Sequence, residues 1–220
     1  MSALYLYACV AGDGPADNLL GAFGEALRLV EAAQLRFAAG ALHGLASATR
    51  EHLAAHDDTV RRLAERFSAV LPLRFGQVVP DESALARELS PVQLEVERAL
   101  ALVEGCEQMT LQVRFEASPH DDEPAPAGGP GARWLRRRAQ LHTLPALAPV
   151  RAALGELLRA ERVRWLPGAK DLARVCHLIP RGGAERYRAA LERAAPVVPG
   201  ATLRVSGPWP TYAFAPECLA

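Results

Sequence analysis

The sequence predicts an α+β protein of two domains, and three observations support this fold class. The chain has 220 residues, which is above the usual size of one small domain. Half of the residues are apolar, and 25 basic side chains balance 25 acidic ones, as in a globular protein with a real core. The second half shows the element order of a ferredoxin-like fold: strand, helix, strand, strand, helix, strand. We therefore expect an N-terminal α+β domain over 1–105, a C-terminal ferredoxin-like domain over 106–206 and a tail over 207–220.

The N-terminal domain should begin with a buried strand. Residues 3–10 form a short aliphatic and aromatic run, and the turn residues at 12–15 end it. Two weaker strands follow over 26–31 and 35–41, where many residues are Gly or Ala.

An amphipathic helix is expected over 47–68, because the apolar period there changes to steps of three and four. A strand with an irregular entry follows over 69–80, since Pro72 cannot donate a hydrogen bond in a central ladder position. A short helix is expected over 82–89. The apolar face of the first helix consists of Leu53, His56, Val60, Leu63 and Phe67.

The next helix should begin at Ser90, which has the features of an N-cap residue. Pro91 follows it in the first turn, and Gln93 stands three residues after the cap. Gly105 can end this helix. Its apolar stripe consists of Val92, Val96, Ala99 and Val103.

The C-terminal domain should open with the clearest strand of the chain, because apolar and polar residues alternate after Gly105. Segment 118–131 is rich in Pro, Gly and acidic residues and is expected to be a flexible surface loop. A helical region over 132–159 follows, and Pro145 and Pro149 should kink or divide it. One side of the strand carries Met109, Leu111, Val113 and Phe115, and the other carries Gln108, Thr110, Gln112 and Arg114.

The remaining elements complete one antiparallel sheet with two helices on one face. Strands are expected over 163–166 and 172–179, separated by a turn. A helix over 184–194 and a short strand over 202–206 follow.

Charge and cysteine usage exclude several classes of protein. A net charge of zero lacks the basic excess of a nucleic-acid binder, so no nucleic-acid partner is expected. The dense basic run at 136–138 is explained by a solvated helix face, with an acidic partner as the alternative. Cysteines occur singly, which indicates neither a zinc ribbon nor a disulfide framework. They are Cys9, Cys106, Cys176 and Cys218, of which the first and third lie in apolar runs and should be buried thiols.

Targeting signals are also missing from the sequence. The first apolar run is short and lacks a basic lead, so it does not resemble a signal peptide. No stretch approaches the length that spans a bilayer, and no lipid-membrane partner is expected. These features predict a cytoplasmic protein.

No motif predicts catalysis, a cofactor or a metal. His52 and His56 are four residues apart on a helix and could share a metal, but no third ligand is evident. Because His56 lies in the apolar stripe, it is interpreted as a core histidine bonded to a carboxylate or a carbonyl. The chain lacks a Gly-x-Ser-x-Gly elbow, a phosphate loop and a dinucleotide-binding glycine motif, so an enzyme is disfavoured.

Four stretches together resemble the gas vesicle protein F/L family. The first is the opening strand at 4–7. The second is 70–76, Val-Leu-Pro-Leu-Arg-Phe-Gly, preceded by a helix with His56, Asp57 and Val60. The third comprises 133–135 with 176–181, and the fourth is the tail sequence at 207–214, Gly-Pro-Trp-Pro-Thr-Tyr-Ala-Phe. The chain departs from the family pattern at Asp57, Trp134, His177 and Thr211.

The resemblance implies two α+β domains, the second a modified ferredoxin-like fold, and a tail that returns to the first domain. It implies a non-enzymatic accessory protein of the gas vesicle, whose partners are the small hydrophobic wall protein, of the GvpA type, and other vesicle accessory proteins. The family residues, expected to be structural or to contact a partner, are His56, Arg74, Phe75, Gly76, Gly207, Pro208, Trp209, Pro210, Tyr212 and Phe214.

These residues suggest a role for the protein and leave an alternative. Wall protein exposes apolar surface, so a helper that covers it would limit aggregation during vesicle nucleation, with strand addition at a sheet edge as one route. Arg74 is interpreted as bonding to carbonyls or a carboxylate beside Phe75, and a docked tail is favoured over a partner-binding one. The alternative is a small-ligand regulator or an enzyme built on ferredoxin-like domains, which a ligand-induced thermal shift would reveal.

Overall fold

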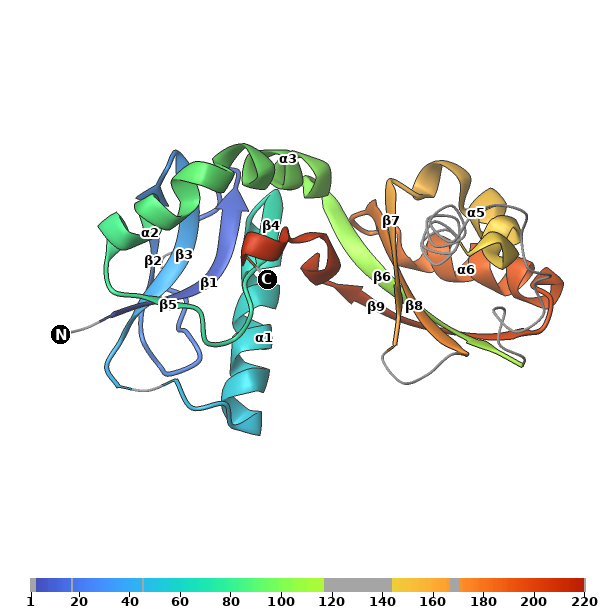
Figure 1. The fold of residues 1–220 in the computed structure, drawn as a ribbon, viewed down its shortest axis with the longest axis horizontal. Helices are drawn as coiled ribbons and strands as arrows, with labels where there is room; N and C mark the ends of the chain where they lie inside the picture. The colour runs from blue at the N-terminus through green and yellow to red at the C-terminus, as the bar shows by residue number, and fades with distance from the viewer. Residues whose placement is uncertain (1–2, 17, 45, 117–143, 167–170, 220) are drawn as a thin grey trace, which may run out of the picture. The chain divides into compact units, whose positions relative to one another are not determined.

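The computed structural model describes residues 3–16, 18–44, 46–116, 144–166 and 171–219. The chain forms two compact units, one of Met1–Cys106 with Trp209–Ala220 and the other of Glu107–Pro208. Each unit has a β-sheet with helices packed on it (Figure 1). The predicted α+β class with two antiparallel sheets is confirmed.

The sheet of the first unit is built around β1. The strand order is β2-β3-β1-β4, with β5 also paired to β1, and all of these pairs are antiparallel. Seven consecutive residues of β1 are buried, because helices cover both faces of the sheet. The strands are β1 Ala3–Ala11, β2 Leu27–Ala32, β3 Leu35–Leu42, β4 Ala69–Pro72 and β5 Val78–Val79.

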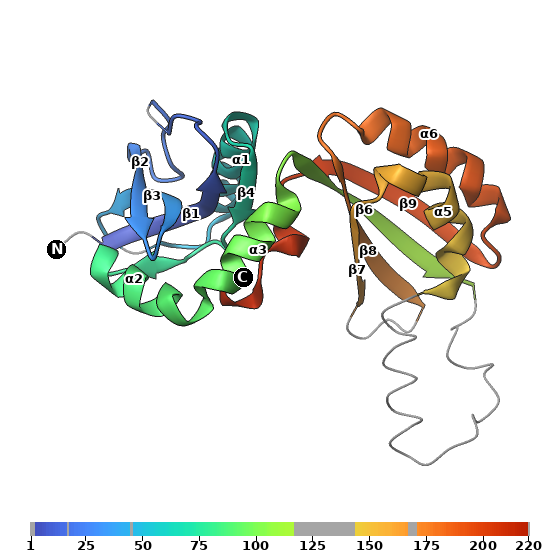
Figure 2. The ribbon, with the colours of Figure 1, turned by 90° about the horizontal axis from the view of Figure 1, so that it is seen from above.

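Three helices enclose this sheet. Figure 2 shows α1 (Arg50–Arg66) on one face and both α2 (Glu82–Leu89) and α3 (Gln93–Val103) on the other. Pro72 is the last residue of β4, an outer strand, where its missing N–H leaves no gap in a central ladder. The predicted 69–80 strand is therefore divided into β4 and β5.

The apolar face of α1 differs from the prediction at its first member. Thr49 caps the helix, accepting a hydrogen bond from the backbone N–H of His52 at 3.2 Å. Leu53 lies in the first turn and is 46% exposed, whereas His56 is buried. The helix thus begins to pack on the sheet one turn later than its apolar pattern suggests.

The prediction that Ser90 caps the next helix is wrong. Ser90 ends α2, and its hydroxyl donates to the carbonyl oxygen of Ala86 at 2.7 Å. A 3₁₀ turn over Ser90–Val92 joins α2 to α3, so the serine is already used by the preceding helix. Leu100, not Ala99, completes the buried stripe of α3.

The second unit has the strand order β7-β8-β6-β9, which together with the chain order β6, α5, β7, β8, α6, β9 is the ferredoxin-like topology. Among the described residues, its strands are β6 Cys106–Phe115, β7 Ala160–Trp165, β8 Leu172–Pro180 and β9 Ala201–Trp209, and its helices are α5 Ala148–Leu154 and α6 Ala184–Ala194.

The core of the second unit lies between its sheet and the two helices. As predicted, Met109, Leu111, Val113 and Phe115 of β6 all belong to it. Gln108 and Thr110, expected on the exposed side, are instead buried. The face of β6 opposite the core is therefore partly covered near the N-terminal end of the strand.

The prolines of the predicted 132–159 region do not kink a long helix. Pro145 opens a 3₁₀ turn, Pro145–Leu147, and Pro149 lies in the first turn of α5, where a missing N–H costs no helical bond. The predictions for the 118–131 loop, the 136–138 basic run and Trp134 lie outside the described residues.

Candidate functional site

The segment 73–76, between β4 and β5, is held by two buried polar side chains. The Gly76 N–H donates to the hydroxyl oxygen of Tyr5 at 3.0 Å. The Nε2 atom of His56 lies 3.1 Å from the carbonyl oxygen of Leu73. Tyr5 and His56 also contact each other, with 3.0 Å between the hydroxyl oxygen and Nδ1. Strand β1 and helix α1 thus clamp both ends of the segment.

One arrangement of protons satisfies this chain of hydrogen bonds. A carbonyl oxygen only accepts, so His56 Nε2 must donate to Leu73 and Nδ1 must accept from Tyr5. Burial lowers the pKa of His56, against the effect of the Leu73 bond, and so favours the neutral ring that this arrangement needs. Burial also raises the pKa of Tyr5 to about 12. The predicted core role of His56, bonded to a carbonyl, agrees with this geometry.

Phe75 completes the clamp from inside the segment. Its ring centroid lies 5.9 Å from that of Tyr5, 5.7 Å from that of His56 and 6.2 Å from that of Phe23. Gly76, which follows, has a φ of +92°, a conformation that L side chains rarely adopt. The glycine therefore lets the chain turn away immediately after the half-buried ring of Phe75.

A second polar pair beside this clamp, buried Tyr7 and half-buried Glu25, was not identified from the sequence. The Tyr7 hydroxyl donates to Glu25 and accepts from the backbone N–H of Ala22 at 2.7 Å. A Cβ atom at Gly40 would lie 2.3 Å from the Glu25 side chain, so that glycine makes room for the carboxylate. The signal for this pair was present in the opening strand, because a buried tyrosine needs a partner for its hydroxyl.

Arg74 does not have the internal role that the sequence suggested. Its neighbours Leu73 and Phe75 face the core, whereas the Arg74 side chain is exposed. Within the described ranges, it forms no hydrogen bond or ion pair. The clamp therefore presents a guanidinium group to the outside from a rigid support.

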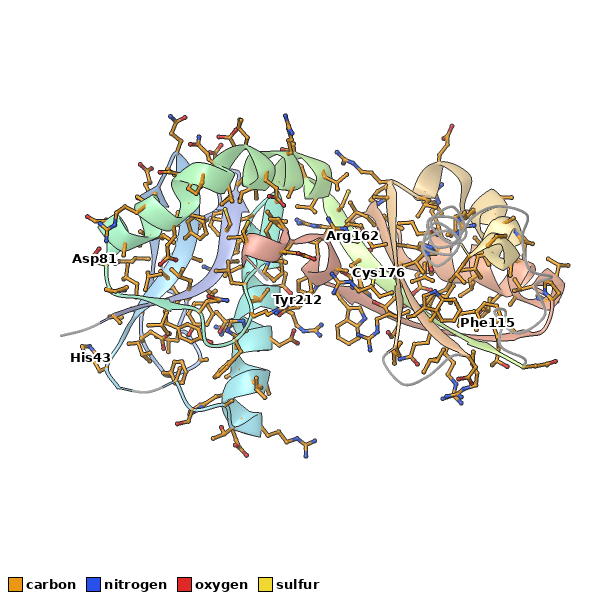
Figure 3. The ribbon with its side chains drawn as sticks, viewed as in Figure 1. His43, Asp81, Phe115, Arg162, Cys176 and Tyr212 are labelled. Atoms are coloured by element: carbon orange, nitrogen blue, oxygen red, sulfur yellow. The ribbon has the colours of Figure 1, made fainter. Side chains whose placement is uncertain are left out.

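The tail contacts α1 through a short chain of polar interactions. The guanidinium of Arg61 lies 4.6 Å from the centroid of the Trp209 ring. Arg61 also forms an ion pair of 2.7 Å with Asp57. The Tyr212 hydroxyl donates to the same Asp57 at 3.0 Å, and Figure 3 shows Tyr212 beside α1. Burial and the negative charge of Asp57 raise the pKa of Tyr212, which keeps the phenol protonated as donor.

Thr211 and residues 214–216 of the tail are buried within the first unit. The Thr211 hydroxyl donates to the carbonyl oxygen of Val70 at 2.6 Å. Phe214 is fully buried. Tyr212–Phe214 form a 3₁₀ turn, so this part of the tail is not extended. Two departures from the family pattern take part in tail docking: Asp57 accepts a hydrogen bond from Tyr212, and Thr211 donates one to Val70.

The tail residues are divided between the two units. Trp209, Pro210, Tyr212 and Phe214 belong to the first unit, together with His56 and 74–76. Gly207 and Pro208 belong to the second unit, where the Gly207 carbonyl accepts from Arg188 at 2.6 Å. Strand β9 runs to Trp209, three residues beyond its predicted end.

The metal site considered for His52 and His56 is not supported. The Nδ1 atom of His52 lies 2.8 Å from the Ser47 carbonyl, and both ring nitrogens of His56 have protein partners. Across the described parts of the chain, no three His, Cys, Asp or Glu side chains gather as a metal site would require. The same parts contain no helix that is both long enough and apolar enough to cross a membrane.

A separate polar network lies in the core of the second unit. His177 is fully buried, with Nδ1 2.7 Å from the Tyr187 hydroxyl and Nε2 2.9 Å from Glu161. Arg151 forms an ion pair of 2.8 Å with the same carboxylate. Burial raises the pKa of Glu161, but the bonds from His177 and Arg151 outweigh it and lower the pKa overall. This network joins β7, β8, α5 and α6.

The fold and the site define a class of protein: two α+β units, the second ferredoxin-like, with the C-terminal tail packed on the first unit. Within the described residues, the titratable side chains of Tyr5, His56 and Tyr212 form hydrogen bonds inside this fold. A family model described as "Gas vesicle synthesis protein GvpL/GvpF" matches residues 3–216, and the chain belongs to this family.

Solved structures show the same fold. The crystal structure of gas vesicle protein GvpF from Microcystis aeruginosa has a TM-score of 0.70 at 18% identity, covering 97% of this chain and 99% of that one. The crystal structure of GvpF from Anabaena sp. PCC7120 has a TM-score of 0.71 at 17% identity, covering 98% and 99%. No curated protein matches the sequence. Family membership implies association with gas vesicles and suggests a structural or accessory role rather than catalysis.

Proposed function

We propose that this protein is a cytoplasmic gas vesicle accessory protein and minor vesicle component that binds the hydrophobic wall protein and limits its aggregation during vesicle nucleation. The wall protein is of the GvpA type, and other vesicle accessory proteins are further partners. The observation that carries the proposal is the family match over residues 3–216. Wall protein must expose apolar surface before assembly, and such surface aggregates unless a helper covers it.

The exposed Arg74 supports a contact surface on the first unit. A guanidinium offers five N–H donors, which suit carbonyl groups that an unassembled partner leaves free. Because Leu73 and Gly76 are hydrogen-bonded through His56 and Tyr5, the segment loses little conformational freedom on binding. A clamp of this kind favours recognition over catalysis.

Outer strands support the second route considered, strand addition. In the sheet of the second unit, β7 and β9 are the outer strands. Such strands have main-chain groups that can pair with a segment of another chain. Pro208 lies in β9 and cannot donate, which favours β7.

The cellular test is complementation of a gas vesicle gene cluster that lacks this protein. Vesicles should be absent or deformed without it and restored by the wild-type chain, as seen by electron microscopy and flotation. Normal vesicles in the deletion strain would refute the proposal.

The biochemical test is suppression of wall-protein aggregation by the purified chain, followed by light scattering. Arg74→Ala should weaken suppression about tenfold, the loss of roughly one charge-assisted hydrogen bond. Arg87→Ala is the matched control, because Arg87 is exposed on α2 of the same unit. Equal suppression by both variants would exclude Arg74 as a contact residue, and no suppression by the wild-type chain would exclude the aggregation role.

A further inference from the structure

The sheet of the second unit has one face covered by α5 and α6 and one face that no described helix covers (Figure 2). Alternate residues of all four strands pack in the core on the helix side, as Val113, Val163, Val175 and Val205 illustrate. The residues between them therefore lie on the opposite face.

That opposite face carries an arginine from every strand. We call it the arginine face and define it by Arg114 of β6, Arg162 and Arg164 of β7, Arg174 of β8 and Arg204 of β9. Four of these side chains are exposed, and Arg162 is half-buried. None of the other residues that these strands place on this face is an Asp or a Glu. A chain with no net charge has thus concentrated positive charge on one surface.

Two of the arginines oppose each other directly. Arg164 and Arg174 are partners in the antiparallel β7–β8 pair, and Arg162 is the partner of Cys176. Figure 3 labels Arg162 and Cys176 on these strands. Like charges directly opposite each other on neighbouring strands destabilise a sheet. Neighbouring strands are about 4.8 Å apart, which is less than the screening length of about 8 Å at physiological salt, so salt does not fully screen the repulsion between such charges. The fold therefore keeps a repulsion that a bound anion would relieve.

An acidic side chain pairs with one arginine of this face. Asp171 precedes β8 and pairs with Arg114 at 3.0 Å, but 62% of the Arg114 side chain remains exposed. No carboxylate of the described residues forms an ion pair with Arg164, Arg174 or Arg204. These three guanidinium groups have room for carboxylates from another molecule.

We propose that the arginine face binds an acidic segment of a partner polypeptide. Guanidinium forks match carboxylates in two-point hydrogen bonds, and Gln112, Thr202 and Ser206 add polar groups on the same face. A nucleic acid fits less well, because single strands are bound by stacking on aromatic side chains. Of the aromatic residues in these strands, Phe115 and Trp165 pack on the helix side instead, and Trp209 at the end of β9 contacts Arg61.

This surface is separate from the Arg74 clamp, which belongs to the other unit. The test uses full-length protein and a fluorescent peptide rich in glutamate, with anisotropy measured at low and high salt. Arg164→Gln with Arg174→Gln should weaken binding at least about tenfold, and salt should weaken the wild-type complex. The matched control is Arg186→Gln with Arg193→Gln, which removes the same charge from exposed positions of α6 and should leave affinity unchanged.

Three results would overturn the proposal. The double variant on the sheet could bind the peptide as the wild type does, or the α6 control could weaken binding equally. A thymidine oligonucleotide or anionic vesicles could bind more tightly than the peptide with the same dependence on Arg164 and Arg174, which would assign the face to that ligand. Thermal denaturation of the double variant checks folding, and relief of the Arg164–Arg174 repulsion predicts an unchanged or higher Tm. The same double variant should still suppress wall-protein aggregation like the wild type. This result would separate the arginine face from the proposed function.

Discussion

Replacing Tyr212 with Phe removes one oxygen atom from the tail and leaves its apolar packing in place. The lost group is the donor to Asp57 at 3.0 Å, in a contact between residues 155 positions apart. Asp57 keeps its ion pair with Arg61, so the carboxylate is not left without a partner. The change therefore measures how much this single hydrogen bond contributes to tail docking.

The expected magnitude follows from the exposure of the acceptor. A hydrogen bond to a charged group contributes about 1.5 to 3 kcal/mol. The Asp57 side chain is 40% exposed, so water replaces part of the lost bond, and we expect about 1 kcal/mol. That free energy corresponds to an increase of about fivefold in the open population of the tail.

Hydrogen exchange measured by mass spectrometry on the C-terminal peptide is the suitable assay. The Phe214 amide donates to the Thr211 carbonyl at 2.9 Å and reports opening of the docked turn. Exchange should accelerate about fivefold in Tyr212→Phe. In an Asp57→Asn background the same substitution should have a smaller effect, giving a coupling of about 1 kcal/mol. Equal acceleration in both backgrounds would refute the role assigned to this bond.

Three further predictions concern single residues. Gly76→Ala should lower the free energy of unfolding, measured by thermal denaturation, by about 1 to 2 kcal/mol, because the Gly76 φ of +92° is unfavourable for alanine. No atom lies within 4 Å of the added Cβ, so a steric clash does not contribute. Gly76→Asn should lower the stability less, and an equal loss in both variants would contradict the backbone explanation. Folding lowers the pKa of the His56 ring. As the pH falls below about 6.5, the ring therefore binds a proton in the unfolded chain before it does so in the folded chain, which favours unfolding. Wild-type stability, measured by urea denaturation, should therefore fall more steeply than that of His56→Asn between about pH 6.5 and 5, and parallel slopes would refute this. The pKa of Glu161 is also lowered, so its contribution is complete above the unfolded value of about 4.3 and is lost at lower pH. The stability gap between wild type and Glu161→Gln should thus be constant near neutrality and shrink below about pH 4.3; a gap that persists in acid would indicate packing loss instead.

Local patterns were sufficient wherever a residue's environment depends on near neighbours. The alternation of β6 from Leu111 to Phe115, the period of α6 and the break at Gly105, whose φ is +64°, all appear in the structure. Errors arose where a residue's environment depends on the position of a neighbouring element. Ser90 is used by α2 instead of α3, and Leu53 lies before the part of α1 that meets the sheet.

The candidate site shows a similar division. The residue types at His56, 74–76 and 209–214 were recognisable as a set, because each motif is continuous in the chain. The contacts of these residues could not be recognised from the sequence, since they join distant segments, as when Thr211 bonds to Val70 across 141 positions. Arg74 shows most clearly what the sequence cannot predict, because an exposed arginine and an internally bonded arginine have the same sequence pattern.

By itself, the sequence determined the α+β class, the element order of the ferredoxin-like unit and the family, because these depend on period, turn residues and continuous motifs. Tertiary structure alone decided that Tyr5 and His56 clamp the 73–76 segment, that Asp57 and Thr211 hold the tail and that five arginines share one sheet face. Those arrangements depend on which strands become neighbours and on which face a helix covers, and pairing between distant segments leaves no trace in local periodicity.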